Sequence, residues 1–177
     1  MKKKLLSAII LTTLIFISTG CNNKDIVNPK AKCKIFECIN KIEPENTIKE
    51  INEIIGFNGE ITDEKYKIYQ WELSDDEVIQ VAYYSSDTSQ IKIKYDRNEL
   101  RNKKVDLSDF ENIKENLKKG VKISYTDLTK KFKSKGTLVA KSSLTKKYTW
   151  VSENGSYITA TIDNKNDRCT AIIGKIK

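Results

Sequence analysis

Two stretches of this sequence, residues 51–71 and 128–150, follow the same pattern, and any fold must accommodate both. In each stretch an amphipathic run ends at a glycine, and a Tyr-x-Trp triplet follows. Self-similarity at a fixed spacing predicts two copies of one supersecondary unit. The spacing is 77 residues for Thr47 and Ser124, Ile51 and Leu128, Ile55 and Phe132, and Gly59 and Gly136, and 79 for Tyr69 and Tyr148 and for Trp71 and Trp150.

Each copy is predicted to begin with two short helices, because apolar residues recur with helical spacing between capping signals. Residues 33–42 carry isoleucines four and three positions apart, which mark one buried face. Thr47 and Glu50 form a capping box for a second helix, which Gly56 ends. In the second half the corresponding signals are the capping box of Ser108 and Glu111, the stop at Gly120, and the cap at Ser124.

Strands are expected after each helix pair, because apolar and polar residues alternate there with a period of two. The predicted strands are one around Ile61, then 68–73, 79–84 and 91–95, and later 137–142, 147–151, 157–162 and 169–176. The fold class is therefore α+β, with two tandem helix-helix-antiparallel-sheet repeats (33–96 and 107–177) that form one curved sheet with helices on its convex side. Residues 97–106 are charged, lack an apolar stripe and are interpreted as a linker.

The first 20 residues are interpreted as a signal peptide, because three lysines precede an apolar run that is too short to cross a bilayer comfortably. Ser18-Thr19-Gly20-Cys21 resembles the lipobox of bacterial lipoproteins, which implies diacylglyceryl attachment at Cys21 and cleavage before it. Residues 21–32 would then form the lipidated end and a polar tether. We expect a lipid-anchored protein on the extracytoplasmic face of the cell membrane.

The charge balance narrows the possible partners. The formal charge of +8 falls to +5 once Lys2, Lys3 and Lys4 are removed with the leader, since 29 basic residues then face 24 acidic ones. This mild excess suits an anionic envelope component, and it does not match the dense basic stripe of a nucleic-acid-binding protein. The chain has no histidine, which excludes Ser-His and Cys-His catalysis and histidine-ligated metals. No cofactor or metal is expected.

The repeated unit, with glycine after its second helix and Tyr-x-Trp on the next strand, resembles the β-lactamase-inhibitory-protein-like superfamily. It is similar to small Gram-positive lipoproteins with a domain of unknown function and, more distantly, to the small lipoprotein of the outer-membrane barrel-assembly machine. The resemblance covers residues 33–177 and implies an open concave sheet face with helices behind it. The inhibitor's acidic binding turn matches Ser74-Asp75-Asp76, so Asp75 and Asp76 are a candidate binding turn, whereas its aromatic turn matches residues 152–156, which contain no aromatic residue.

The concave face is the favoured binding surface. The Tyr-x-Trp residues are expected in the core under the helices, so alternation places the other residues of each strand on the open face. A membrane-tethered module that binds a protein or an anionic envelope component, without catalysis, is favoured over an ordinary solvated face, an enzyme inhibitor, or an enzyme that uses carboxylate, tyrosine or lysine chemistry. The candidate binding residues are Gln80, Tyr84, Lys92, Lys94, Tyr157, Thr159 and Thr161.

Three cysteines follow Cys21, and their pairing stays open. An exported compartment favours oxidation, but Cys33 and Cys38, five residues apart in one helix, point to different sides. A bond between them requires the helix to start late. Buried or lone thiols are therefore expected at Cys33, Cys38 and Cys169.

Overall fold

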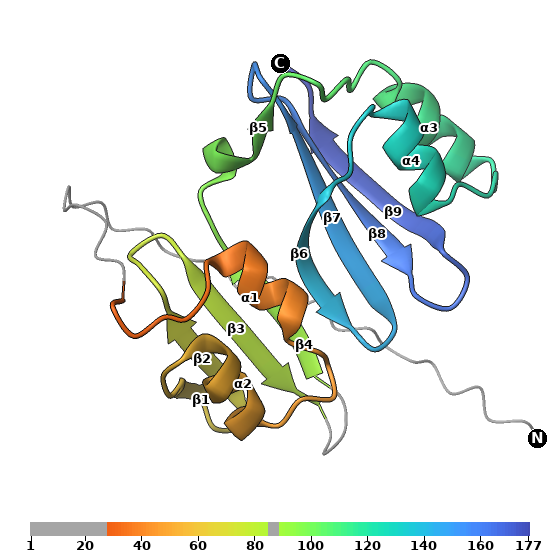
Figure 1. Cartoon of the computed structure of the whole chain (residues 1–177). Helices are drawn as coiled ribbons and strands as arrows, with labels where there is room; N and C mark the ends of the chain where they lie inside the picture. Colours follow the sequence, from red (N-terminus) through yellow and green to blue (C-terminus); the bar gives the residue numbers. More distant parts are fainter. Residues whose placement is uncertain (1–27, 85–88) are drawn as a thin grey trace, which may run out of the picture.

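The computed structural model describes residues 28–84 and 89–177 (Figure 1). Four short α-helices and nine strands lie in the described part, together with one 3-10 helix, η1. The first half contains α1 (Ile35–Lys41), α2 (Ile48–Ile55), β1 (Glu60–Asp63), β2 (Ile68–Glu72), β3 (Val78–Tyr83) and β4 (Ser89–Lys94). Then come η1 (Arg97–Leu100), β5 (Arg101–Asn102), α3 (Phe110–Lys118), α4 (Tyr125–Lys131), β6 (Thr137–Ser142), β7 (Thr145–Ser152), β8 (Tyr157–Asp163) and β9 (Arg168–Lys175).

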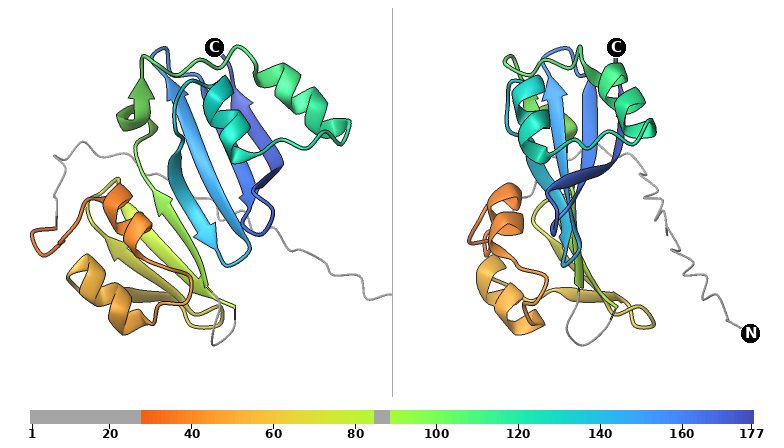
Figure 2. Two further views of the ribbon diagram at one scale, coloured as in Figure 1. Left: turned by 45° about the vertical axis from the view of Figure 1, so that its right-hand side comes forward. Right: turned by 90° about the vertical axis from the view of Figure 1, so that its right-hand side faces the viewer.

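One open sheet runs through the molecule in the order β1-β2-β3-β4-β6-β7-β8-β9, and each neighbour is antiparallel to the next (Figure 2). The short strand β5 pairs with β7 in the parallel sense. The two halves meet where β4 pairs with β6 over only three residue pairs. The predicted α+β class is confirmed.

Both helix pairs cover the same face of this sheet. Strand register places Val81, Ile91, Lys141, Lys146 and Ile162 side by side across five strands. Val81 and Ile91 belong to the core beneath α1 and α2, and Ile162 belongs to the core beneath α3 and α4. The opposite face, which we call the helix-free face, carries the adjacent row Gln70, Gln80, Lys92, Ala140, Lys147, Thr161 and Ala171.

Each core is built around a buried tryptophan that packs on a glycine. Trp71 is fully buried, and its indole Nε1–H donates to Asn52 Oδ1 at 2.9 Å. A Cβ atom added to Gly59 would lie 2.6 Å from Cζ2 of this indole. In the second core Trp150 Nε1–H donates to the Ser134 carbonyl at 2.8 Å. Both tryptophans are core residues, as predicted.

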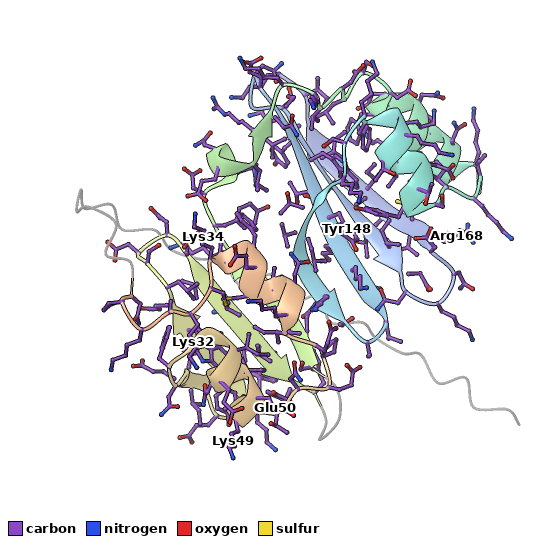
Figure 3. All side chains as sticks on the ribbon, in the orientation of Figure 1. Lys32, Lys34, Lys49, Glu50, Tyr148 and Arg168 are labelled. Atoms are coloured by element: carbon purple, nitrogen blue, oxygen red, sulfur yellow. A yellow bond between two sulfur atoms is a disulfide. The ribbon has the colours of Figure 1, made fainter. Side chains whose placement is uncertain are left out.

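Tyr148 packs against both cores and therefore connects them (Figure 3). Its ring centroid lies 4.3 Å from that of Tyr125 on α4. The only ion pair to a buried side chain in the described part also lies at the junction of the halves: Lys141 Nζ is 3.1 Å from Glu43 Oε1, and the lysine side chain is 3% exposed. The junction thus depends on side chains on the helix-covered face as well as on the strand pairing.

The capping signals were predicted correctly in two cases and wrongly in one. Thr47 with Glu50 and Ser124 with Asp127 form reciprocal capping boxes. Ser108 does not cap α3, which begins after Asp109 without a side-chain cap. The Ser108 backbone N–H instead donates to the Asp106 carboxylate at 3.0 Å, which holds the chain in a turn before the helix starts.

The expectation of unpaired thiols is wrong for two of the three cysteines. Cys33 and Cys38 form a disulfide with a Cα–Cα distance of 5.6 Å. The bond is possible because α1 begins at Ile35, so Cys33 lies outside the helix and the helical spacing that separates the pair does not apply. Cys169 is free and buried, as expected. Burial raises the pKa of its thiol to about 11.

The chain is fixed to the body before the disulfide. Asn28 N–H donates to the Leu73 carbonyl at 2.6 Å, and Lys32 N–H donates to the Ile55 carbonyl at 2.7 Å. The end of the predicted tether therefore contacts the folded body. No helix of residues 28–84 and 89–177 is both long and apolar enough to span a membrane.

The predicted linker contains two elements that the alternation pattern did not indicate. Arg97–Leu100 forms η1 and Arg101–Asn102 forms β5. Neither element has an apolar stripe. They are positioned instead by pairing of β5 with β7 and by the Arg97 guanidinium, which stacks 3.6 Å from the ring centroid of Tyr157.

Candidate functional site

The helix-free face has two lysines on either side of a small residue at its centre. Lys92 on β4 pairs with Ala140 on β6, and Ala140 pairs with Lys147 on β7. Because neighbouring strands are about 4.8 Å apart, the two lysine Cα atoms lie about 10 Å apart with only a methyl group between them. Burial lowers the pKa of Lys92, and the positive charge of Lys147 lowers it further. An anionic group placed between the two ammonium groups would relieve this repulsion.

Gln80 lies next to this pair and is 8% exposed, so the expectation that it is an accessible contact residue is wrong in part. Its Nε2 donates to Gln70 Oε1 at 2.8 Å, and Gln70 Nε2 donates to Glu72 Oε1 at 2.7 Å. This chain of amides holds the Gln80 side chain down on the sheet. Within the described part, Gln80 Oε1 is the only buried side-chain oxygen or nitrogen without a hydrogen-bond partner. It is an acceptor to which a ligand N–H or O–H can donate.

Two predicted threonines lie on the same face. Thr161 pairs with Lys147 in the central row, and Thr159 lies one row further along. The hydroxyl groups of Thr159 and Thr149 are 2.8 Å apart and hydrogen bond to each other. Thr161 and Thr159 therefore extend the polar surface beyond Lys147 toward β9.

The two predicted tyrosines are at opposite ends of the face rather than together. Tyr84 follows β3, is 68% exposed and donates its hydroxyl to Gln90 Oε1 at 2.9 Å. Tyr157 pairs with Val151 beyond the opposite end of the central row, and it is half-buried beneath Arg97. The expected continuous surface that exposes both rings is not formed, because η1 covers one end of the face.

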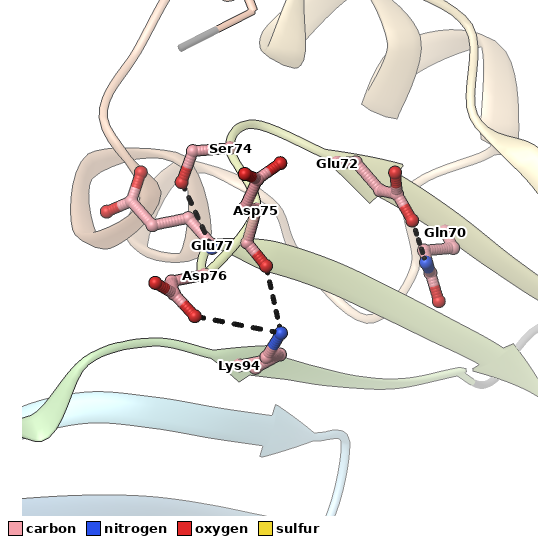
Figure 4. Close-up of polar contacts among 7 residues, drawn as sticks. All are labelled: Gln70, Glu72, Ser74, Asp75, Asp76, Glu77 and Lys94. Atoms are coloured by element: carbon pink, nitrogen blue, oxygen red, sulfur yellow. Dashed lines mark hydrogen bonds and ion pairs between the residues drawn. The ribbon is translucent and has the colours of Figure 1, made fainter. Parts of the chain in front are cut away.

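Lys94 and the acidic turn contact one another (Figure 4). Lys94 Nζ donates to the Asp75 carbonyl at 2.9 Å and lies 4.0 Å from the Asp76 carboxylate. The ammonium group thus fixes the turn and offsets part of its negative charge. Lys94, predicted as a contact for a ligand of the sheet, supports the turn instead.

Lys147 and Ala140 were not among the predicted site residues. The signal for Lys147 was present, because Tyr148 and Trp150 face the core and alternation places Lys147 on the opposite side. Ala140 was harder to place, because a β-bulge between Leu138 and Ala140 shifts the register of β6 against β7. No single-strand pattern shows that Ala140 separates two lysines.

Several predicted features lie outside the described residues: the leader, the lipobox with Cys21, and the turn at Ser85-Ser86-Asp87. Within the described ranges there is no group of three or more Cys, Asp or Glu side chains placed to hold a metal ion. Comparisons with protein-family models, curated proteins and solved structures find no match to this chain.

Proposed function

We propose that this protein is a lipid-anchored, extracytoplasmic binding module that captures an acidic partner on its helix-free face and performs no catalysis. The observation that carries the proposal is the pair Lys92 and Lys147 across Ala140. Two cations on one face of a rigid sheet attract a carboxylate or phosphate, and the small residue between them leaves room for it.

An acidic protein segment is the partner that fits best. The unpartnered Gln80 Oε1 beside the lysine pair requires a hydrogen-bond donor. A polypeptide offers both a carboxylate for the lysines and an N–H for the glutamine, whereas a phosphodiester polymer lacks the N–H donor. Thr161 continues the surface with a hydroxyl that is able to donate or accept.

We also propose that the body consists of two copies of one helix-helix-four-strand unit, with the strands in one curved sheet and the helices on its convex side. Three shared details support this. Both units cap their second helix with a capping box. Both pack a glycine on a tryptophan. Both have a register shift at the same place, between Ile61 and Asp63 and between Leu138 and Ala140, 77 residues further on.

The test of binding uses Lys92→Ala/Lys147→Ala and a matched control, Lys119→Ala/Lys122→Ala, which removes two exposed lysines from the α3–α4 region. Each protein is expressed in its native membrane, crosslinked in intact cells and recovered with its partner. We expect at least a tenfold loss of capture for the face variant and none for the control. Equal capture by the two variants rules out the proposed surface. Capture that survives protease treatment of the partner identifies an envelope polymer rather than a protein.

The anchor is tested separately. Mass spectrometry of the membrane fraction should find an acylated N-terminal Cys21, and Cys21→Ala should release the protein from the membrane. Recovery of the protein in the soluble fraction with an unmodified Cys21 contradicts the anchor without bearing on the helix-free face.

A further inference from the structure

The charge of the chain is divided between the two ends of the sheet. Residues 33–96 contain 7 lysines and 14 acidic residues, a net charge of −7, whereas residues 107–177 contain 15 lysine and arginine residues and 7 acidic residues, a net charge of +8. The first range supplies β1 to β4 and the second supplies β6 to β9. Figure 3 shows Glu50 on α2 and Arg168 at the start of β9 on opposite sides of the molecule.

Both end strands have a free outer edge among residues 28–84 and 89–177. The edge strand β1 begins and ends with Glu60 and Asp63, and β9 begins and ends with Arg168 and Lys175. The six residues between Arg168 and Lys175 carry no charge, and Ile173 is 67% exposed. An edge without a charge in its centre is a template for pairing with another strand.

The directions of the end strands are compatible with pairing between copies. Each of the eight strands on the path is antiparallel to its neighbour, so β1 and β9 run in opposite directions. A second copy set with its β1 beside β9 therefore pairs antiparallel and keeps its helices on the same face. The junction of β4 with β6 shows that three residue pairs suffice to join two parts of this sheet, and β1 has four residues.

We propose that copies of this chain associate head to tail, with β1 of one copy paired to β9 of the next. Register places Glu60 and Lys175 on the helix-free face of their strands. Both side chains are exposed, and within the described part neither has a charged or hydrogen-bonding side-chain partner. Across the new junction they lie close enough to form an ion pair. The contact is heterologous, so it adds further copies rather than closing a dimer.

A junction of a few residue pairs buries little area, so the association is weak in solution. Sedimentation velocity of the chain from Asn22 to Lys177, which contains every described residue, is measured at low salt. We expect the weight-average mass to rise above the monomer at concentrations of about 0.1 mM and higher, and to return toward the monomer as salt increases. A monomeric mass up to about 1 mM overturns the proposal.

Charge reversal identifies the edges. Glu60→Lys and Lys175→Glu should each weaken association at least fivefold, and the double variant should restore it, because the pair is re-formed with its signs exchanged. Glu45→Lys and Lys122→Glu make the same changes in net charge at exposed positions away from the edges and should have much smaller effects. Association that ignores Glu60→Lys, or that Lys175→Glu strengthens, indicates pairing of β9 with β9 and overturns the head-to-tail arrangement.

Discussion

Replacement of Gly136 by alanine tests whether the contact of glycine with tryptophan determines the packing of α4 on the sheet. The new Cβ would lie 2.7 Å from both Cε2 and Cζ2 of Trp150 and 2.9 Å from Tyr148 Cβ. Carbon atoms pack at about 3.5–4.0 Å, so the indole would have to move by about 0.8 Å. The ring has little freedom to do so, because Trp150 is 1% exposed, donates to Ser134, and packs edge-to-face on Phe132 with centroids 5.2 Å apart.

Overpacking of this kind costs about 2–3 kcal/mol of unfolding free energy. For a body of this size we expect a fall in Tm of about 4–12 °C, measured by calorimetry together with urea unfolding. Gly59→Ala should behave alike, because it meets Trp71 in the same way. Gly120→Ala is the control: its φ is +80° and nothing lies within 4 Å of the added Cβ, so it reports backbone strain alone, about 1 kcal/mol. If Gly136→Ala destabilises no more than Gly120→Ala, the steric reasoning is refuted.

Three further predictions concern the ion pair at the junction of the halves and the cysteines. Glu43→Gln should cost about 1–3 kcal/mol in urea unfolding, below the usual range for a buried pair because Glu43 is 57% exposed, while Lys141→Met should cost less because no buried charge remains; equal costs would contradict this. The double variant Cys33→Ser/Cys38→Ser should lose about 2 kcal/mol by loop entropy, and reduction of the wild type should produce the same shift, whereas an unchanged midpoint shows that the bond adds nothing. Because burial raises the pKa of Cys169 to about 11, the folded thiol should resist an aromatic disulfide reagent at pH 8, and stability should fall as pH rises from about 9 to 11, since only the unfolded chain is deprotonated there; fast labelling of folded protein at pH 8 argues against this.

The local elements were predictable because each has its signal within a few residues. Thr47 with Glu50 states where α2 begins, and Gly56, with φ of +107°, states where it ends. The alternation around Trp71 and Trp150 correctly separated the core side of each strand from the other side. These signals act over one turn of helix or one strand, so the sequence alone is sufficient to reveal them.

The features that the sequence did not reveal depend on contacts between distant residues. The Cys33–Cys38 bond depends on where α1 starts, and α1 has no side-chain cap to mark that residue. η1 is held by the stacking of Arg97 on Tyr157, 60 residues away in the sequence. The central row of the candidate site depends on the register of β4 against β6, which three residue pairs determine. Patterns within single strands contain no information about such registers.

The attachment of the N-terminal segment has a mechanical consequence. Tension applied at that end loads the Asn28–Leu73 hydrogen bond first and the Lys32–Ile55 hydrogen bond next. Once these break, the pull reaches Cys33, where a covalent bond transfers it to Cys38 within the first core. Five residues are thus able to peel away as a short extensible leader while α1 stays seated. The second half bears no force until the first core itself yields, so a surface that spans both halves keeps its shape under load.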